Sequence, residues 1–428
     1  MSQDAVVNVP EFRLPAGLAG LRNWYRDVFS IREIEDDVAL KWMAGAILLG
    51  FFVTFNSWMY FEGTTVKAVE NSTFVCWPIF QNCQSLIWMS TLPEGYSQMI
   101  FFMVMFGVMV GTVFMMQKGM WTYVHMAIFV LFAAKLYFML MAHSHKGNYD
   151  YYHNSFCILY LFARHKIFFL RFVLVFFYFL STASKIYPSW IMGEYFTAMK
   201  TGLPIFPFGS EAIMTNVVIV MEMVFSWLLL SNNRIVQRVV LTFFIIFHLY
   251  SGILVGYRYP STVLPALIIL FGPWFRFTPP PTGASSLFGW AFAGALTIAQ
   301  LIPHLMPGDE KLTLEGNYFG LYMFEANHQC FATISEGDKV LQSLRVSNAR
   351  FRCNPYDMWF PAKNKYCRSG AAQIKMQFSH SVNGRAFREI VNEPDICQLS
   401  YSAFGRNSWI KDEISAPIVG IPVKNTYR

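Results

Sequence analysis

The sequence predicts a polytopic α-helical membrane protein with a small β-rich extracytoplasmic domain at its C-terminal end. Of the 428 residues, 55% are hydrophobic and only 14% are charged, whereas a soluble domain usually carries about 25% charged residues. The hydrophobic residues gather in about nine runs, most of them near the roughly 20 residues that a helix needs to cross a bilayer. After residue 306 the apolar runs become short and alternating, which is typical of strands.

The chain divides into three parts by composition. Residues 1–41 form a polar arm, residues 42–306 a transmembrane domain with the candidate site, and residues 307–428 the β-rich domain. No cleavable signal peptide is visible, because the arm is polar and mixed in charge. We therefore expect the first apolar helix to act as the insertion signal and the arm to be cytoplasmic.

The expected spans follow the apolar runs in order. They are residues 42–60, 98–116, 120–141, 152–163, the run that ends at Lys185, 212–230, 239–256, 263–275 and about 287–303. A loop rich in proline and glycine, Pro188 to Gly209, follows Lys185, and we expect part of it to re-enter the membrane.

Basic residues and cysteines agree on the orientation of the chain. Basic residues in short loops mark the cytoplasmic side, and here they fall on one side if the spans alternate from a cytoplasmic N-terminus. These residues are Lys118, Arg164, Lys166, Arg171, Arg234, Arg238 and Arg276. The loop after the first span and residues 307–428 then lie on the other side, in the periplasm of a bacterium or the lumen of the endoplasmic reticulum.

The cysteines predict disulfide bonds on that outer side. Cys76 and Cys83 flank a Trp-Pro turn and are expected to form a local disulfide in an oxidising compartment. The β-rich domain carries four more cysteines, which allow two disulfides in any of three pairings. They are Cys330, Cys353, Cys367 and Cys397. Cys157, inside a span, is the expected free thiol.

Ionisable residues within or beside the spans are the candidates for chemistry. Such residues are costly in a bilayer, so they usually face the protein interior and pair with one another. We expect Lys185, His153 and His248 to form a cluster that opens to the outer face, with Glu222 beneath it. Loss of hydration favours the neutral form of an amine, and a neutral amine is a usable general base.

Each of these residues also has a structural interpretation. Lys185 could extend to the lipid headgroups, as many lysines at helix ends do. His248 could be a neutral core histidine bonded to a carbonyl group. Glu222 and Lys135 could form a purely structural ion pair within the membrane.

Other functional classes find little support in the sequence. The net charge of +7 is explained by membrane topology, so we predict no nucleic-acid partner. We also predict no metal site, because the histidines lack ligand spacing except at His143 and His145, and this pair is typical of a solvated loop.

Several segments resemble a known family in the same order along the chain. The segment YFLSTASKIYPSWIMGEY, with Lys185, Trp190 and Gly193, resembles the lysine-bearing segment of vitamin K-dependent gamma-glutamyl carboxylases and their bacterial relatives. The segment DYYHNSFCILYLF is similar to the histidine motif of that family and places His153 at the matching position.

The likeness continues through the later spans. The stretch from Glu222 to Pro273, which includes His248 and Tyr257, is similar to the acid, Phe-His and Tyr-Pro pattern of the family. The segment GNYFGLYMFEANHQC resembles the entry to its lumenal β-domain. Ser184 departs from the animal enzymes, which carry a second lysine beside the first, and the C-terminal domain is far smaller than theirs.

The resemblance implies a reaction. Lys185 as a neutral amine would deprotonate a reduced vitamin K-type naphthoquinone, which would take up O2 and become a base strong enough to remove the γ-proton of a glutamate. Capture of CO2 would leave gamma-carboxyglutamate and the quinone epoxide. His153 would act catalytically at the glutamyl group, and His248, with Glu222, Trp190 and Tyr257, would hold the quinone.

The implied partners are the lipid bilayer, the quinone and a glutamate-containing protein or peptide. Two alternatives stay open at this point. One is a quinone-dependent enzyme on the same scaffold with a different acceptor. The other is a non-catalytic membrane protein that binds quinone or lipid and whose C-terminal domain docks a partner.

Overall fold

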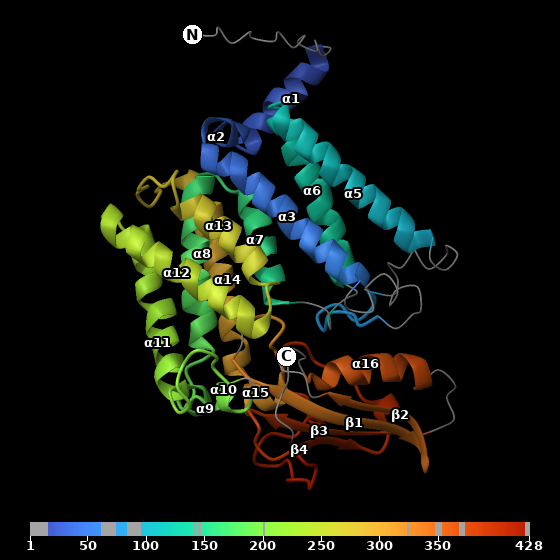
Figure 1. The fold of residues 1–428 in the computed structure, drawn as a ribbon. Coiled ribbons are helices and arrows are strands. Elements are labelled where there is room, and N and C mark those ends of the chain that lie inside the picture. The colour runs from blue at the N-terminus through green and yellow to red at the C-terminus, as the bar shows by residue number, and fades with distance from the viewer. Residues whose placement is uncertain are drawn as a thin grey trace.

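A helical bundle and a small sheet domain make up the molecule (Figure 1). The computed structural model describes residues 16–60, 74–83, 96–140, 143, 147–199, 202–322, 325–346, 353–367 and 373–423. The β-rich domain lies against one end of the bundle, and helix α1 lies at the opposite end (Figure 1).

Helices make up most of the described chain before residue 306. Two short helices, α1 (Ala16–Val28) and α2 (Ile31–Asp36), precede the first long one. The bundle that follows consists of α3 (Val38–Tyr60), α5 (Tyr96–Gln117), α6 (Trp121–Leu140), α7 (Asn148–Phe162), α8 (Lys166–Ala183), α11 (Glu211–Met223) with η4 (Phe225–Leu230), α12 (Arg234–Val255), α13 (Pro260–Phe271) and α14 (Leu287–Leu301).

Six helical segments in the described part of the chain are long and apolar enough to cross a membrane. They are residues 38–58, 121–140, 166–183, 211–230, 234–254 and 284–305. Two apolar helices are shorter, Met103–Gln117 within α5 and Pro260–Phe271, which is α13. At 1.5 Å per residue α13 is about 18 Å long, less than the roughly 30 Å of the hydrocarbon.

Helix α8 is the centre of the bundle. Within the protein, 72% of its span is buried, against 22% of the span at residues 284–305. Its beginning is fixed from α2, because the carboxylate of Glu33 accepts hydrogen bonds from the backbone N–H groups of His165 (3.0 Å) and Lys166 (2.8 Å). These N–H groups have no partner inside the helix, so the carboxylate caps it.

The loop after α8 folds into a compact unit. It contains α9 (Pro188–Ile191) and α10 (Glu194–Thr197), and Gly193 between them has φ +78°. A separate hydrophobic core holds the unit together and includes Trp190, Tyr195, Leu203 and, from α12, Leu254.

The β-rich domain is a four-stranded antiparallel sheet with a helix on one face (Figure 1). Its strands are β1 (His328–Glu336), β2 (Lys339–Val346), β3 (Ile374–Val382) and β4 (Arg388–Glu393), in the order β2-β1-β3-β4. Ile334, Met376 and Ile390 are fully buried and form its core with Tyr356 of α16 (Pro355–Tyr366). A short helix, α15 (Glu310–Thr313), links the bundle to this domain.

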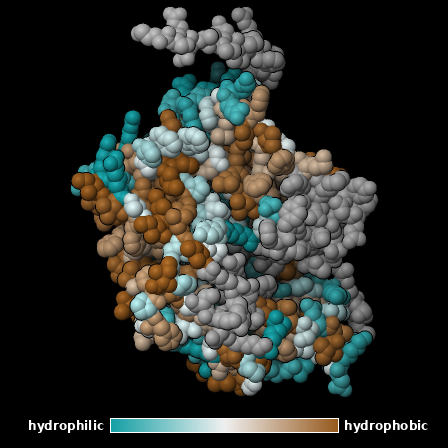
Figure 2. Space-filling model, in the orientation of Figure 1, coloured by the Kyte–Doolittle hydropathy of each residue, from teal (hydrophilic) through white to brown (hydrophobic). Residues whose placement is uncertain are grey.

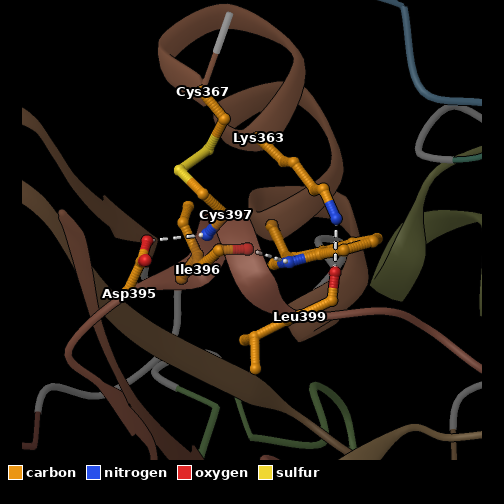
Figure 3. Close-up of a disulfide and its surroundings, with 7 residues drawn as sticks. Lys363, Cys367, Asp395, Ile396, Cys397 and Leu399 are labelled. Atoms are coloured by element: carbon orange, nitrogen blue, oxygen red, sulfur yellow. Dashed lines mark hydrogen bonds between the residues drawn. A yellow bond between two sulfur atoms is a disulfide. The ribbon is translucent and has the colours of Figure 1, made fainter. Parts of the chain in front are cut away.

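All six predicted disulfide cysteines are paired. The bonds are Cys76–Cys83, Cys330–Cys353 and Cys367–Cys397, and Cys157 is free and buried. Figure 3 shows how Cys367–Cys397 ties the end of α16 to the short helix η8 (Ile396–Gln398), beside a hydrogen bond from Lys363 to the carbonyl of Leu399. Such bonds stabilise a small domain chiefly by restricting its unfolded chain.

The loop with the first disulfide packs directly on the C-terminal domain. The hydroxyl of Tyr356 donates to the carbonyl of Cys76 (3.0 Å), and Gln81 donates to the carbonyl of Tyr401 (2.9 Å). His143, which the sequence placed in a solvated loop, is only 2% exposed and lies 2.6 Å from Asp357. That prediction was wrong because the partner of His143 comes from a distant helix; His145 lies outside the described residues.

Candidate functional site

Helix α8 presents Lys185 on a single polar face near its end. Tyr178, Thr182 and Lys185 are spaced by four and three residues, so they lie on the same side of a helix. The regular helix ends at Ala183, and the turn continues because the N–H of Lys185 donates to the carbonyl of Thr182 (2.9 Å). Pro188 then starts α9 and prevents α8 from continuing.

Lys185 forms a buried ion pair with Glu222 of α11. Its Nζ lies 2.5 Å from Oε2 of Glu222, and the two side chains are 3% and 1% exposed. The hydroxyl of Thr182 donates to the same carboxylate oxygen (2.5 Å). The pair has no net charge, so its burial among apolar helices costs less free energy than burial of a single charge.

Trp190 closes one side of this pair. Nζ of Lys185 lies 5.6 Å from the centre of its ring, a distance at which an ammonium is attracted to the ring face. The indole is 2% exposed, and its Nε1 has no hydrogen-bond partner among the described residues. An indole N–H normally has a partner when it is buried, so this group is a free donor beside the lysine.

His248 lies in the same region of the bundle. Its Nε2 is 2.5 Å from the hydroxyl of Tyr178, and its ring centre is 5.4 Å from that of Tyr259. The Tyr259 ring in turn lies 5.4 Å from that of Tyr152. Nδ1 of His248 has no hydrogen-bond partner in the described part of the chain.

Shared contacts join these groups into one site. Tyr178 and Thr182 lie on one face of α8, and the first contacts His248 while the second donates to Glu222. Residues of four helices, α8, α11, α12 and α13, meet here, since Tyr259 is the N-cap residue of α13. Among the described residues, the arrangement combines a buried ion pair with an indole N–H and an imidazole nitrogen that have no hydrogen-bond partner.

His153 belongs to a second buried cluster. Its Nδ1 is 2.9 Å from Nζ of Lys135, and its Nε2 is 2.8 Å from the carbonyl oxygen of Ile47. Lys135 also pairs with Asp150 at 2.8 Å, and both side chains are fully buried. An ammonium can only donate, so Nδ1 accepts, Nε2–H donates to the carbonyl, and both ring nitrogens are engaged.

The predicted grouping therefore needs two corrections. Glu222 and Lys135 do not pair with each other, because Glu222 meets Lys185 and Lys135 meets Asp150. His153 bonds to Lys135 and not to Lys185. Sequence gives the depth of a residue in a span, but the rotation of each helix and the choice of neighbour depend on packing.

Tyr257 lies at the edge of this region. Its side chain is 54% exposed, and its ring lies so close to Gly252 that a Cβ there would come within 2.4 Å of it. Contact of Tyr257 with a quinone stays a prediction. The buried phenol beside His248 is that of Tyr259, two residues later.

Sequence reasoning overlooked several members of both clusters. Thr182 and Tyr178 precede Lys185 by three and seven residues, and Asp150 precedes His153 by three. This spacing puts each on the same helix face as its partner, so it was a usable signal. The described residues contain no group of three or more His, Cys, Asp or Glu side chains that could hold a metal ion.

Fold and site together define a class, a helical bundle with helices long and apolar enough to cross a membrane, a disulfide-bonded sheet domain and a buried Lys-Glu pair. Comparison with known proteins adds no closer assignment, since no family model, curated protein or solved structure matches the chain.

Proposed function

We propose that this chain is a membrane enzyme that carries out acid–base chemistry on a lipid-soluble substrate. The observation that carries the proposal is the buried Lys185–Glu222 pair near Nε1 of Trp190 and Nδ1 of His248, two nitrogens with no hydrogen-bond partner among the described residues. Together with the sequence motifs, it favours a reduced vitamin K-type naphthoquinone, whose oxygenation with O2 is coupled to gamma-carboxylation of glutamate by CO2.

The pair offers a route to a neutral amine that does not create net charge. Transfer of one proton from Nζ of Lys185 to the carboxylate of Glu222, across 2.5 Å, converts an ion pair into an amine and a carboxylic acid. In apolar surroundings the neutral form gains relative to the charged form. The neutral amine of Lys185 then acts as general base. The carboxyl group of Glu222 holds the proton that Lys185 has released.

The residues present fit a quinone. A flat ring with oxygens at opposite ends needs hydrogen-bonding groups in an apolar environment, and the indole N–H of Trp190 and Nδ1 of His248 have no partner among the described residues. When bound, the reduced quinone would supply the electrons that convert O2 and generate a strong base. The surrounding tyrosine and phenylalanine rings would exclude water, which would quench that base.

We further propose nine spans and an orientation with the N-terminus in the cytoplasm. In the described part of the chain, nine longer helices make up the bundle when α7, α13 and all of α5 are counted with the six long apolar segments. Support for the orientation comes from the contact between the Cys76–Cys83 loop and the sheet domain, which puts all three disulfides on one side. That side is then the oxidising one, periplasmic or lumenal.

A glutamate-containing protein or peptide is the proposed acceptor. The sheet domain contacts α9 and α10, the segment that directly follows Lys185, through Asn383 and Arg385. A substrate that docks on this domain would therefore lie next to the site.

A second candidate is a non-catalytic protein that binds quinone or lipid. It is favoured by the engagement of both ring nitrogens of His153, which leaves that residue no free atom for a substrate. A third, an enzyme on the same scaffold with another acceptor, uses the same Lys-Glu pair.

An assay with purified protein, reduced vitamin K, O2, labelled CO2 and a glutamate peptide separates the three. We expect epoxide and labelled peptide from the wild type. Lys185→Met should lower both by about 10²-fold to 10⁴-fold, the usual contribution of a general base. Lys166→Met is the matched control, because Lys166 is equally buried at the other end of α8 and donates to the carbonyl of Ala163 (2.8 Å).

Each result assigns a function. Epoxide without labelled peptide identifies a different acceptor. Wild type and Lys185→Met that are equally inactive, while both bind quinone, identify the non-catalytic protein and refute the enzyme.

A further inference from the structure

The loop between α10 and α11 exposes an apolar tip that packing does not explain. Ile205, Phe206 and Phe208 are 87%, 40% and 94% exposed, and residues 202–210 contain no charged side chain. Large hydrophobic side chains scattered singly on a surface need no explanation, but a contiguous group marks an interaction site. The tip is defined here as residues 203–208.

The tip is held in place from below. Leu203 is buried in the small core around Trp190, and the hydroxyl of Tyr250 donates to the carbonyl of Pro204 (2.6 Å). The ring of Phe206 packs edge-on against Tyr250, with the ring centres 5.6 Å apart. Ile205 has φ +79°, which β-branched residues rarely adopt, so the fold holds this residue in an unfavourable backbone conformation with its side chain outward.

The apolar surface continues from the tip along the neighbouring spans. Helix α11 begins three residues after the tip, and Ile213, Val217, Val220 and the C-cap residue Val224 form an exposed stripe on this side of it. Hydrophobic side chains predominate along α11 and the later part of α12, whereas hydrophilic side chains gather where α12 begins (Figure 2). A membrane-spanning helix exposes such a stripe to lipid, and the tip extends that lipid-facing surface.

We propose that residues 203–208 insert into the bilayer leaflet on the side of the sheet domain. The tip lies at the end of the bundle nearest that domain, where α11 starts (Figure 1), and therefore at the level of the membrane interface. Aromatic and aliphatic side chains on an uncharged loop are the composition of an interfacial anchor. Lipid is the occupant, because the tip is continuous with a surface that already faces lipid.

Insertion has a consequence for the candidate site, which rests on the proposed function. The tip and Trp190 share one core, and Lys185 lies 5.6 Å from the Trp190 ring centre. An anchored tip would hold the α9–α10 unit against the leaflet and give a lipid-dissolved substrate a direct approach to Lys185.

Depth measurement by spin labelling tests the insertion without any activity. A nitroxide is attached at Phe208→Cys or at Ile205→Cys, and the protein is placed in phosphatidylcholine vesicles with a minor share of phosphatidylglycerol. We expect collisions with O2 to exceed those with a water-soluble nickel chelate several-fold at both positions. Val340→Cys is the control, because Val340 is a 58% exposed hydrophobic residue on β2 and should be reached by nickel instead.

Two results would overturn the proposal. Nickel collisions at positions 205 and 208 equal to those at 340 would place the tip in water. Low collision rates with both reagents would place it against protein, such as a second copy of the chain. The epoxide assay is independent, so a tip found in lipid stands even if no enzyme activity is detected.

If activity is present, the double variant Ile205→Ser with Phe208→Ser gives a further test. We expect a several-fold higher KM for the lipid-dissolved substrate with an unchanged kcat. A fall in kcat as large as the fall in kcat/KM, or an unchanged KM, would contradict the approach route but not the insertion.

Discussion

Two buried lysines show how single residues are stabilised in this bundle. Lys185 is satisfied by Glu222 and by the face of Trp190, whereas Lys135 is satisfied by Asp150 and His153. Each set carries one acidic partner, so neither leaves an unpaired charge in apolar surroundings. The two sites differ in their neighbours. Beside Lys185, Nε1 of Trp190 and Nδ1 of His248 have no hydrogen-bond partner among the described residues, whereas both ring nitrogens of His153 beside Lys135 are engaged.

A double-mutant cycle at Lys185 and Glu222 distinguishes stability from catalysis. Lys185→Met should destabilise the protein by about 3–5 kcal/mol, because it leaves a buried carboxylate without its partner. Adding Glu222→Gln should recover most of that loss while activity stays absent. Thermal unfolding in detergent measures the first effect, and equal stabilities of the single and double variants would contradict the pairing.

His380 in the sheet domain makes stability depend on pH. Burial lowers the pKa of His380 to about 4, while its Nδ1–H donates to the carbonyl of Leu312 (2.6 Å) and its Nε2 lies 3.0 Å from Nδ1 of His328. In the unfolded chain the pKa is near 6.5, so the unfolded state binds more protons between these values. The contribution of His380 to the free energy of unfolding is therefore complete above about pH 6.5. It falls by up to about 3 kcal/mol as the pH drops towards 4.

The variant His380→Gln isolates this contribution. Its amide can still donate to Leu312 but does not titrate, so its free energy of unfolding should fall less steeply between pH 7 and pH 4. Parallel pH profiles for wild type and variant would show that other groups cause the acid sensitivity. Urea unfolding followed by tryptophan fluorescence gives both curves.

At the scale of elements, Gly50 of α3 allows this helix to lie close to α7. A Cβ at Gly50 would lie 2.1 Å from Cδ2 of His153. The imidazole cannot move away without loss of its bonds to Lys135 and Ile47. The glycine therefore allows the two helices to approach, as small residues do between membrane helices.

Gly50→Ala should consequently disturb the bundle. We expect a loss of about 1–3 kcal/mol from overpacking, together with slower folding or lower yield. Gly107→Ala in α5 is the control, since nothing lies within 4 Å of a Cβ there, and alanine should be neutral or stabilising by up to about 1 kcal/mol. Similar melting temperatures for the two variants would contradict the close contact.

At the scale of the whole molecule, Asn383 links the sheet domain to the segment after Lys185. Its amide nitrogen donates to the hydroxyls of Tyr187 (3.0 Å) and Ser189 (2.7 Å), and its oxygen accepts from the N–H of Asn327 (2.8 Å). The two hydroxyls already donate elsewhere, to the carbonyl of Glu325 and to Glu194. They can therefore only accept from Asn383.

Asn383→Asp should weaken this junction although it keeps the shape of the side chain. A carboxylate has no N–H to donate, and it would face two oxygen acceptors in a site that is 6% exposed. We expect faster hydrogen exchange in α9 and α10. Asn392→Asp is the control, because Asn392 bonds to Glu389 within the sheet domain, and equal exchange in both variants would contradict the link.

Much of the architecture could be predicted from local sequence. The long apolar runs, the strand-like pattern after residue 306 and the six disulfide cysteines all correspond to described features. Lys185, Glu222 and His248 were also recognised as members of one region. These predictions depend on composition, on helical length and on the cost of a charge in a bilayer. All three can be judged from residues that are close together in the sequence.

The partners could not be predicted in this way. Sequence left three pairings for the four C-terminal cysteines and grouped His153 with Lys185, although it bonds to Lys135. It also placed His143 in a solvated loop, whereas its partner Asp357 lies 214 residues away. The sequence by itself determined that this is a mainly helical chain with helices apolar enough to cross a membrane and ionisable groups within them. Only the tertiary structure decided which of them meet, because that depends on helix rotation and on contacts between residues far apart in the chain.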